Sequence, residues 1–290
     1  MREFHYRLRH AVGGNRPGAH AASSLGGGHR MAGHARLFDI PDPRRLDLRA
    51  SLRDVRGEWL VRTHRQRAAT PLHAVVDVSA SMSFGAHASK LERAADFVEA
   101  MGNSAFQAGD PAGLIGFDAA ERAVVDLPAR HGRGIGHALA GCLRTMVRDH
   151  VAAGRGGRME SGAGLQPAIE RLAERDGLVF LVSDFQWHLD VLDAVLERLH
   201  RASVVPVVVW DRAEIEPPAA TGLLGVRDAE TGRGRALWVG GRLRTRWREH
   251  IAQRRHEIET VFGAHDTRPF YLLDEFDPAP LSQYFLEGYG

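Results

Sequence analysis

From residue 72 onward, strand-like apolar runs alternate with segments of helical periodicity, and this alternation is the strongest constraint on the fold. The runs HAVVDVS, AGLIGFD, LVFLVSD and SVVPVVVWD are β-branched and carry polar residues mainly at their ends, which is typical of parallel strands buried on both faces. Apolar residues recur at helical spacing between them, as in residues 91–105 and 135–147. We therefore predict an α/β fold with an open, mostly parallel sheet covered by helices on both faces.

The remaining segments extend this pattern to the end of the sequence. RAVVDLP predicts a strand beside AGLIGFD, and GLLGVRD and RALWVGG flank a turn sequence, which predicts a hairpin near residues 222–240. A helix over residues 242–262, a strand at RPFYLL and a short helix over residues 280–286 follow. We assign residues 71–290 to one domain with the hairpin as an insertion.

Residues 1–70 differ from the rest in charge and in composition. They hold 14 arginines and six acidic residues, a net charge of +8, so the remaining residues carry −6 of the total of +2. Residues 11–36 are rich in Gly, Ala, Ser and His without any apolar period, which predicts a loop. We assign residues 1–70 to a basic extension that docks on the acidic remainder of the chain or on a partner. Its scattered aromatic residues make nucleic-acid binding the weaker alternative.

Cysteine count and hydropathy constrain the compartment. The single cysteine, Cys142, cannot form an internal disulfide, which suits a reducing environment. No apolar run approaches the roughly 20 residues of a membrane-spanning helix. The start, MREFHYRLRH, is charged where a signal peptide needs its apolar core. We expect a soluble, cytoplasmic protein.

Polar residues gather where two predicted strands end. The first strand ends in Asp77-Val78-Ser79-Ala80-Ser81, and the second ends in Ser183-Asp184. Binding sites of open α/β sheets form at the carboxyl ends of strands, and carboxylate and hydroxyl oxygens suit Mg²⁺ or Ca²⁺. Asp77, Ser79, Ser81 and Asp184 are therefore candidate metal ligands. The alternative is a capping role, in which Ser81 or Ser83 caps the following helix and Asp77 accepts from loop amides.

These residues carry a family resemblance. The motif DVSAS, the later SDF and the order of strands resemble a von Willebrand factor A domain with its metal-ion-dependent adhesion site. Residues 42–62 (DPRRLDLRASLRDVRGEWLVR), followed by VVDVSASMSFG and KLERAADFVEAM, resemble the bacterial MoxR-associated branch of that family. The resemblance covers most of residues 38–285. Arg44, Arg45 and Asp47 match the charged stretch of this branch, whereas Leu48 stands in place of its usual Trp.

The resemblance implies a non-enzymatic, chaperone-like adaptor that acts with a MoxR-type AAA+ ATPase in the maturation of a target protein or its metal centre. The start MREFHYRL and the length are similar to the methanol-oxidation members, for which methanol dehydrogenase or its maturation factors would be the client. The resemblance also implies how such an adaptor binds its partner: the open coordination position of the bound metal accepts a carboxylate of the partner.

The resemblance also shows where this chain departs from the family. Ala163 occupies the place of the usual Thr ligand in the segment from Ser161 to Leu165, so the chain loses one hydroxyl unless Ser161 substitutes for it. We therefore expect Mg²⁺ or Ca²⁺ to bind weakly or not at all.

The hypothesis that the chain is an enzyme has less support. A metal-dependent phosphohydrolase could use Asp77 and Asp184, but such enzymes prefer a second Asp where this chain has Ser79. The single lysine, Lys90, lies on the next predicted helix rather than in a later motif. Neither a P-loop nor a G-x-S-x-G elbow occurs in the sequence. We expect no enzymatic activity.

Overall fold

The computed structural model describes residues 2–7, 17–26, 30–118, 125–153, 164–227, 234–273 and 275–288. The chain divides into two compact units: Met1–Arg9 with Pro71–Gly290, and His10–Thr70. In sequence, the smaller unit is thus inserted between Arg9 and Pro71. This differs from an extension that starts at residue 1, because the first residues belong with the larger unit.

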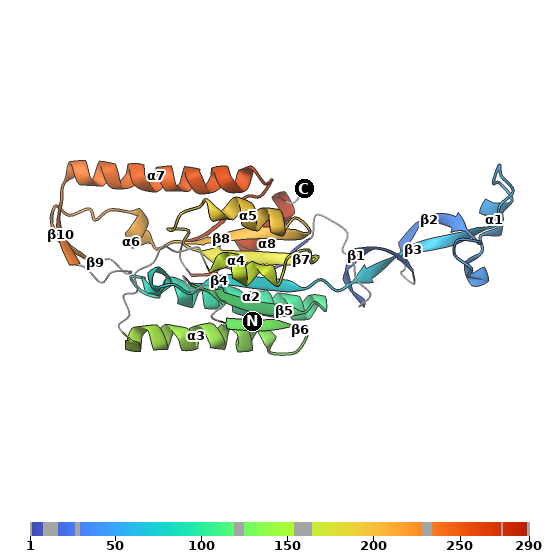
Figure 1. Ribbon diagram of the computed structural model, residues 1–290, viewed down its shortest axis with the longest axis horizontal. Helices are drawn as coiled ribbons and strands as arrows, with labels where there is room; N and C mark the ends of the chain where they lie inside the picture. Colours follow the sequence, from blue (N-terminus) through green and yellow to red (C-terminus); the bar gives the residue numbers. More distant parts are fainter. Residues whose placement is uncertain are drawn as a thin grey trace. The chain divides into compact units, whose positions relative to one another are not determined.

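The larger unit is built on one sheet of six strands. Its strands are β4 (Leu72–Asp77), β5 (Ala112–Phe117), β6 (Val125–Arg130), β7 (Gly177–Ser183), β8 (Ala202–Val209) and β11 (Phe270–Leu272). They lie in the order β11-β8-β7-β4-β5-β6 (Figure 1). Every neighbouring pair is parallel except β5 and β6 at one edge. The predicted α/β, von Willebrand A-like fold is confirmed.

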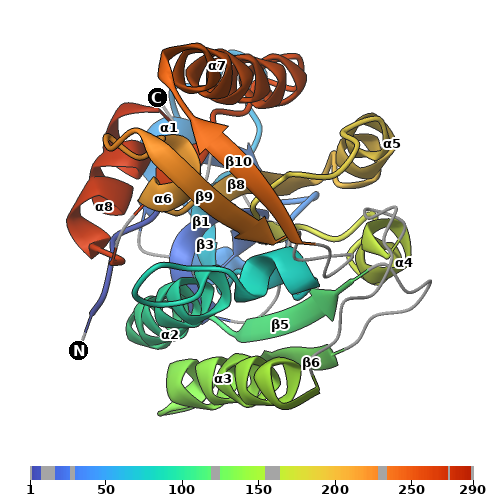
Figure 2. The same ribbon diagram turned by 90° about the vertical axis from the view of Figure 1, so that its left-hand side faces the viewer.

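Helices cover both faces of this sheet (Figure 2). One face packs against α2 (Lys90–Ala108), α3 (Ile135–Ala153) and α8 (Pro278–Glu287), and the other packs against α4 (Leu165–Glu170), α5 (Val191–Arg198) and the second half of α7 (Gly241–Gly263). The central strand β4 is buried along its whole length. Each face of the sheet has its own hydrophobic core: the first lies under α2, α3 and α8, and the second lies under α4, α5 and α7. Ala74 and Val76 point into the first core and Val75 points into the second, because successive strand side chains alternate between faces. This double burial explains the continuous apolar runs in the sequence.

Residues near the start of the chain complete the first core. Phe4 is 2% exposed, and its backbone N–H donates to Ser104 Oγ at 2.8 Å. Its ring lies 5.9–6.3 Å, between centroids, from four phenylalanines: Phe97, Phe180, Phe276 and Phe285. Edge-to-face and offset aromatic pairs at these distances stabilise a core beyond their buried area.

The smaller unit contains a three-stranded antiparallel sheet in the order β1-β3-β2, built from β1 (Pro17–Gly26), β2 (Arg30–Arg36) and β3 (Leu60–Ala68). Strands occupy much of the segment that we predicted as a loop over residues 11–36. The small residues there have no apolar period, so pairing with β3, distant in sequence, creates strands that local pattern does not reveal.

Asp47 is the polar centre of the smaller unit. Its carboxylate accepts from Arg62 Nε at 2.8 Å and lies 3.0 Å from His34 Nε2. It also accepts from the backbone of Ala50 at 3.1 Å, which caps the short helix α1 (Leu48–Ser51) after the 3-10 turn η1 (Pro43–Arg45). The hydrogen bonds from Arg62 and His34 hold the pKa of Asp47 well below its usual range.

Four short elements complete the larger unit: η2 (Ala80–Ser83), α6 (Arg212–Ile215), β9 (Gly222–Arg227) and β10 (Gly234–Val239). β9 and β10 pair antiparallel as a hairpin, in the place where the sequence predicts one. Among the described residues, no helix combines the length and the apolar character that a membrane span requires.

We predict that Phe4→Ala lowers the free energy of unfolding by about 3 to 5 kcal/mol, because it leaves a cavity among packed rings. Phe38→Ala is the matched control, since Phe38 is 95% exposed, and we expect a change within about 0.5 kcal/mol. Urea denaturation of both variants measures the difference. Equal effects would show that the first residues do not belong to the core.

A second prediction concerns the contact between α2 and α3. A Cβ atom added to Gly102 would lie 2.4 Å from the Cα of Gly136, so Gly102→Ala must push the helices apart and cost about 1 to 3 kcal/mol. A Cβ atom added to Gly141, on α3, would have no atom within 4 Å beyond its chain neighbours and the backbone of its own helix. Gly141→Ala should therefore stabilise the helix by about 0.5 to 1 kcal/mol. Opposite signs in thermal unfolding would confirm the close contact, and equal signs would contradict it.

Candidate functional site

The chain turns sharply where β4 ends at Asp77. Asp77 Oδ1 accepts a hydrogen bond from the backbone N–H of Ser79 at 2.9 Å, which closes the type of turn that Asp makes with the residue two positions on. The Oγ atoms of Ser79 and Ser81 lie 3.1 Å apart. Three of the four candidate ligands are therefore brought together by the turn itself.

Helix α2 begins after a further loop. Its N-terminus is capped by Ser89, whose side chain accepts from the backbone of Glu92 while Glu92 bonds back to Ser89, a capping box. The alternative prediction that Ser81 or Ser83 caps this helix is wrong, because the intervening 3-10 turn and loop place the start of α2 later.

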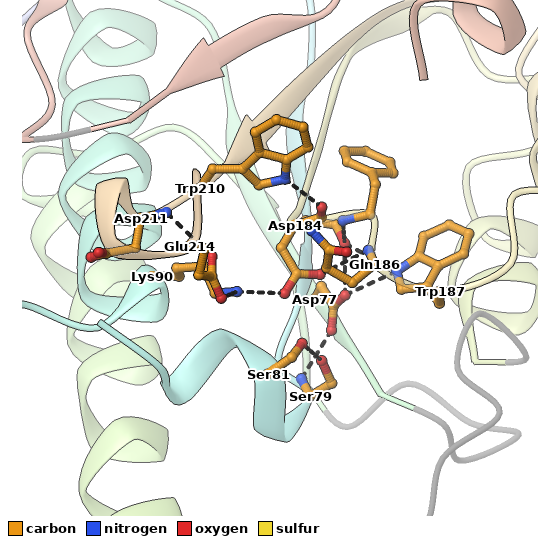
Figure 3. Close-up of polar contacts among 12 residues, drawn as sticks. Asp77, Ser79, Ser81, Lys90, Asp184, Gln186, Trp187, Trp210, Asp211 and Glu214 are labelled. Atoms are coloured by element: carbon orange, nitrogen blue, oxygen red, sulfur yellow. Dashed lines mark hydrogen bonds and ion pairs between the residues drawn. The ribbon is translucent and has the colours of Figure 1, made fainter. Parts of the chain in front are cut away.

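The fourth candidate, Asp184, follows β7, which lies beside β4. Val76 and Val182 are paired in the parallel ladder, so the two strands end side by side and bring Asp184 next to Asp77 (Figure 3). The backbone N–H of Gln186 donates to Asp184 Oδ1 at 3.1 Å.

Asp77 lies in a closed environment. Its Oδ2 accepts from Ser183 Oγ at 2.7 Å and from Trp187 Nε1 at 3.1 Å, and its side chain is almost fully buried. Burial raises the pKa of Asp77 to about 6, and repulsion from the Asp184 carboxylate adds to the shift, against hydrogen bonds from Ser183 and Ser79.

Lys90, at the first position of α2, supplies the positive charge of the site. Its Nζ donates to Asp184 Oδ2 at 2.7 Å and to Glu214 Oε1 on α6 at 2.8 Å (Figure 3), and its side chain is 0% exposed. Burial alone would lower the pKa of Lys90, but the carboxylates of Asp184 and Glu214 outweigh burial and raise it. The lysine is therefore charged where it is buried.

A second buried ion pair lies one turn further along α2. Arg93 Nη2 donates to Asp211 Oδ2 at 2.6 Å, and its Nη1 donates to the backbone carbonyl of Trp210 at 3.2 Å. The indole N–H of Trp210 donates in turn to the carbonyl of Asp184 at 2.8 Å. Because residues three apart lie on one helix face, Lys90 and Arg93 together connect α2 to the segments after β7 and β8.

As arranged, these groups do not fit a resident divalent cation. Mg²⁺ and Ca²⁺ need six or more oxygen ligands, whereas both carboxylate oxygens of Asp77 and of Asp184 already accept from protein donors, one of them from an ammonium. Within the described parts of the chain, no three His, Cys, Asp or Glu side chains are grouped to hold a metal ion. Ser161 and Ala163 lie outside the described residues. Metal binding stays a prediction.

Sequence reasoning identified the two strand ends but missed Lys90 and Glu214. Lys90 lies on the helix after the first motif, where the sequence predicts no role for it, yet the structure places its ammonium on Asp184. One signal could have found it: Lys90 is the single lysine in a chain with 37 arginines. Glu214 has no comparable signal, since α6 is a four-residue helix.

Comparison with known protein families gives one match. Residues 36–257 match the family described as "Protein of unknown function DUF58". The chain belongs to this family. The matched residues include all four candidate ligands together with Lys90 and Glu214, so the site lies within the part that defines membership.

Solved structures give more distant similarities. An aerotolerance-related membrane protein from Bacteroides fragilis is 15% identical, covers 76% of this chain and 98% of its own, and has a TM-score of 0.42. An uncharacterized membrane-spanning protein from Vibrio fischeri is 17% identical, with 74% and 99% coverage and a TM-score of 0.21. Proximal thread matrix protein 1 from the mussel byssus is 15% identical, with 48% and 37% coverage and a TM-score of 0.32. No curated protein matches the sequence.

We predict that Trp187→Phe lowers the free energy of unfolding of this family member by about 1 to 3 kcal/mol, because it removes the indole donor that Asp77 Oδ2 and Ser183 Oγ share. Trp238→Phe is the control, since Trp238 is 67% exposed and its replacement should have little effect. Denaturant titration measures both. If the two variants were equally stable, the indole would not support the site.

Proposed function

We propose that this chain is a non-enzymatic interaction module of the DUF58 family. One observation carries the proposal: the side chains of Asp77, Ser183 and Asp184 at the strand ends bond to protein partners and are almost completely buried. A nucleophile, general acid or general base must come within hydrogen-bond reach of its substrate. Asp77 and Asp184 face protein donors instead, which supports the non-enzymatic assignment over a phosphohydrolase that uses this pair.

The surface around the buried site offers a docking face. Three large apolar side chains are exposed on the segments that surround the strand ends: Phe84 after η2 (42% exposed), Leu223 on β9 (72%) and Trp238 on β10 (67%). Figure 2 looks onto this end of the larger unit, where β9 and β10 form their hairpin. Exposed aromatic and aliphatic side chains that the fold does not need are typical anchors of protein interfaces.

The partner that we propose is a MoxR-type AAA+ ATPase. Its support is the resemblance of residues 42–62 and of the DVSAS segment to the MoxR-associated branch, together with the family match across residues 36–257. The chain has no P-loop of its own, so an ATPase would supply the energy for remodelling a client. We propose that the protein acts in the cytoplasm beside that ATPase.

The client is the finer part of the proposal. The start MREFHYRL and the length of the chain resemble the methanol-oxidation accessory protein MxaS, which makes methanol dehydrogenase or one of its maturation factors the first client to examine. The support for this client is confined to the sequence.

We predict that the full chain binds the MoxR-type ATPase of the same organism and that Leu223→Ser with Trp238→Ser weakens binding at least about tenfold, because two apolar anchors are lost. Leu286→Ser on α8 is the control, since Leu286 is 63% exposed outside these segments. Biolayer interferometry with ATP, with ADP and without nucleotide measures the affinity. No binding in any state would overturn the partner, and equal loss in the control would overturn the face. Phosphatase turnover that Asp77→Asn abolishes would overturn the non-enzymatic assignment.

A further inference from the structure

Lys90 is unusual both in residue type and in position. The chain uses arginine 37 times and lysine once, and that one lysine is completely buried. An ammonium is a compact point charge, whereas a guanidinium is a wide planar fork. A compact ammonium suits this fully buried position between two carboxylates.

The surroundings of Lys90 resemble the surroundings of a metal ion more than those of a surface ion pair. Its Nζ lies 2.7 Å from Asp184 Oδ2 and 2.8 Å from Glu214 Oε1, and Asp77 is the next carboxylate along the strand ends (Figure 3). Two carboxylates from two different segments thus meet around one cation, and a third, Asp77, lies beside Asp184. Buried carboxylates at such spacing require a positive charge among them.

Glu214 occupies a special position in this cluster. It lies on α6, after β8, and its side chain is 26% exposed, the most exposed member of the group. Its second oxygen accepts from the backbone of Asp211 in a capping box, which fixes the direction of the carboxylate. The Glu214 carboxylate therefore contacts the buried Lys90 ammonium from the more exposed side of the site. In this position the chain provides its own acidic ligand.

We propose that the Lys90 ammonium takes the place of the divalent cation at this strand-end site and that Glu214 takes the place of an incoming acidic ligand. The site is then complete without metal, and it holds α2, α6 and the segment after β7 in one arrangement. Partner binding at this end of the sheet is metal-independent. The inference goes beyond the proposed function: the metal-free site is tested on the chain alone, and only the statement on partner binding rests on the proposed function.

Binding of Mn²⁺, followed by electron paramagnetic resonance, tests the first half of the proposal. We expect the wild-type chain to show no saturable binding up to about 1 mM, the weak end of the range for protein calcium sites. Lys90→Ala leaves Asp184 and Glu214 without their cation, and we expect this variant to gain one Mn²⁺ site. The double variant Lys90→Ala with Asp184→Asn should lose that site again.

Thermal unfolding gives a second readout and a matched control. Mg²⁺ or Ca²⁺ should raise the melting temperature of Lys90→Ala by several degrees, since a ligand that binds only the folded state stabilises it, and should leave the wild type unchanged at constant ionic strength. Arg93→Ala breaks the neighbouring buried pair with Asp211 without freeing Asp184. We expect it to lose stability and to gain no response to divalent cations.

Two results would overturn the proposal. One is a wild-type Mn²⁺ site with a Kd below about 1 mM that Asp77→Asn removes, because the chain would then use a metal despite Lys90. The other is a folded Lys90→Ala that gains no divalent-cation binding, because the ammonium would then be a structural ion pair only. Lys90→Met, which keeps most of the side-chain volume, replaces Lys90→Ala if the latter does not fold. If neither variant folds, the wild-type measurement alone decides.

Failure of this proposal and failure of the proposed function are distinguishable. Loss of ATPase binding leaves the Mn²⁺ result untouched, since no partner takes part in it. Conversely, Mn²⁺ binding by the wild type would overturn the metal-free site, whereas the interferometry measurement would still report whether the ATPase binds.

Discussion

The buried contact between the Lys90 ammonium and the carboxylates of Asp184 and Glu214 determines how the end of the sheet is organised. Taking charges out of water is costly, and only close pairing with further hydrogen bonds compensates for it. Each member of this group therefore fixes the others, and with them α2, α6 and the segment after β7. Arg93 repeats the arrangement with Asp211, so two successive basic side chains of one helix face connect segments that are far apart in the sequence.

This organisation changes what the D-x-S-x-S motif does. The motif forms the tight turn expected of it, with Asp77 accepting from Ser79. However, the turn faces inward, because Ser183 and Trp187 cover the second carboxylate oxygen of Asp77. The motif therefore helps to shape the segment that follows it, and this segment carries Phe84, one of the exposed apolar side chains to which we assign docking.

Sequence patterns predicted the sheet because each buried parallel strand, such as β4, is apolar on both faces and therefore visible as a run. They predicted Asp77 and Asp184 because both follow such runs directly. They did not predict the role of Lys90, since its partners lie on other elements and only the packing of α2 brings them together. Phe4 was missed for a related reason: the few residues around it are too short a segment to show a period. The strands β1 and β2 were missed because long-range pairing, and not local composition, creates them.

The aromatic cluster around Phe4 has a consequence for the order of events during synthesis. Phe4 stacks on Phe285 of α8, so an early residue of the chain packs against a late one. The larger unit cannot seal its first core until α8 has left the ribosome, whereas the smaller unit, His10–Thr70, is contiguous in sequence and is free to fold long before that. Until then, the rings of Phe97 and Phe180 lack the aromatic neighbours that Phe276 and Phe285 provide in the folded unit.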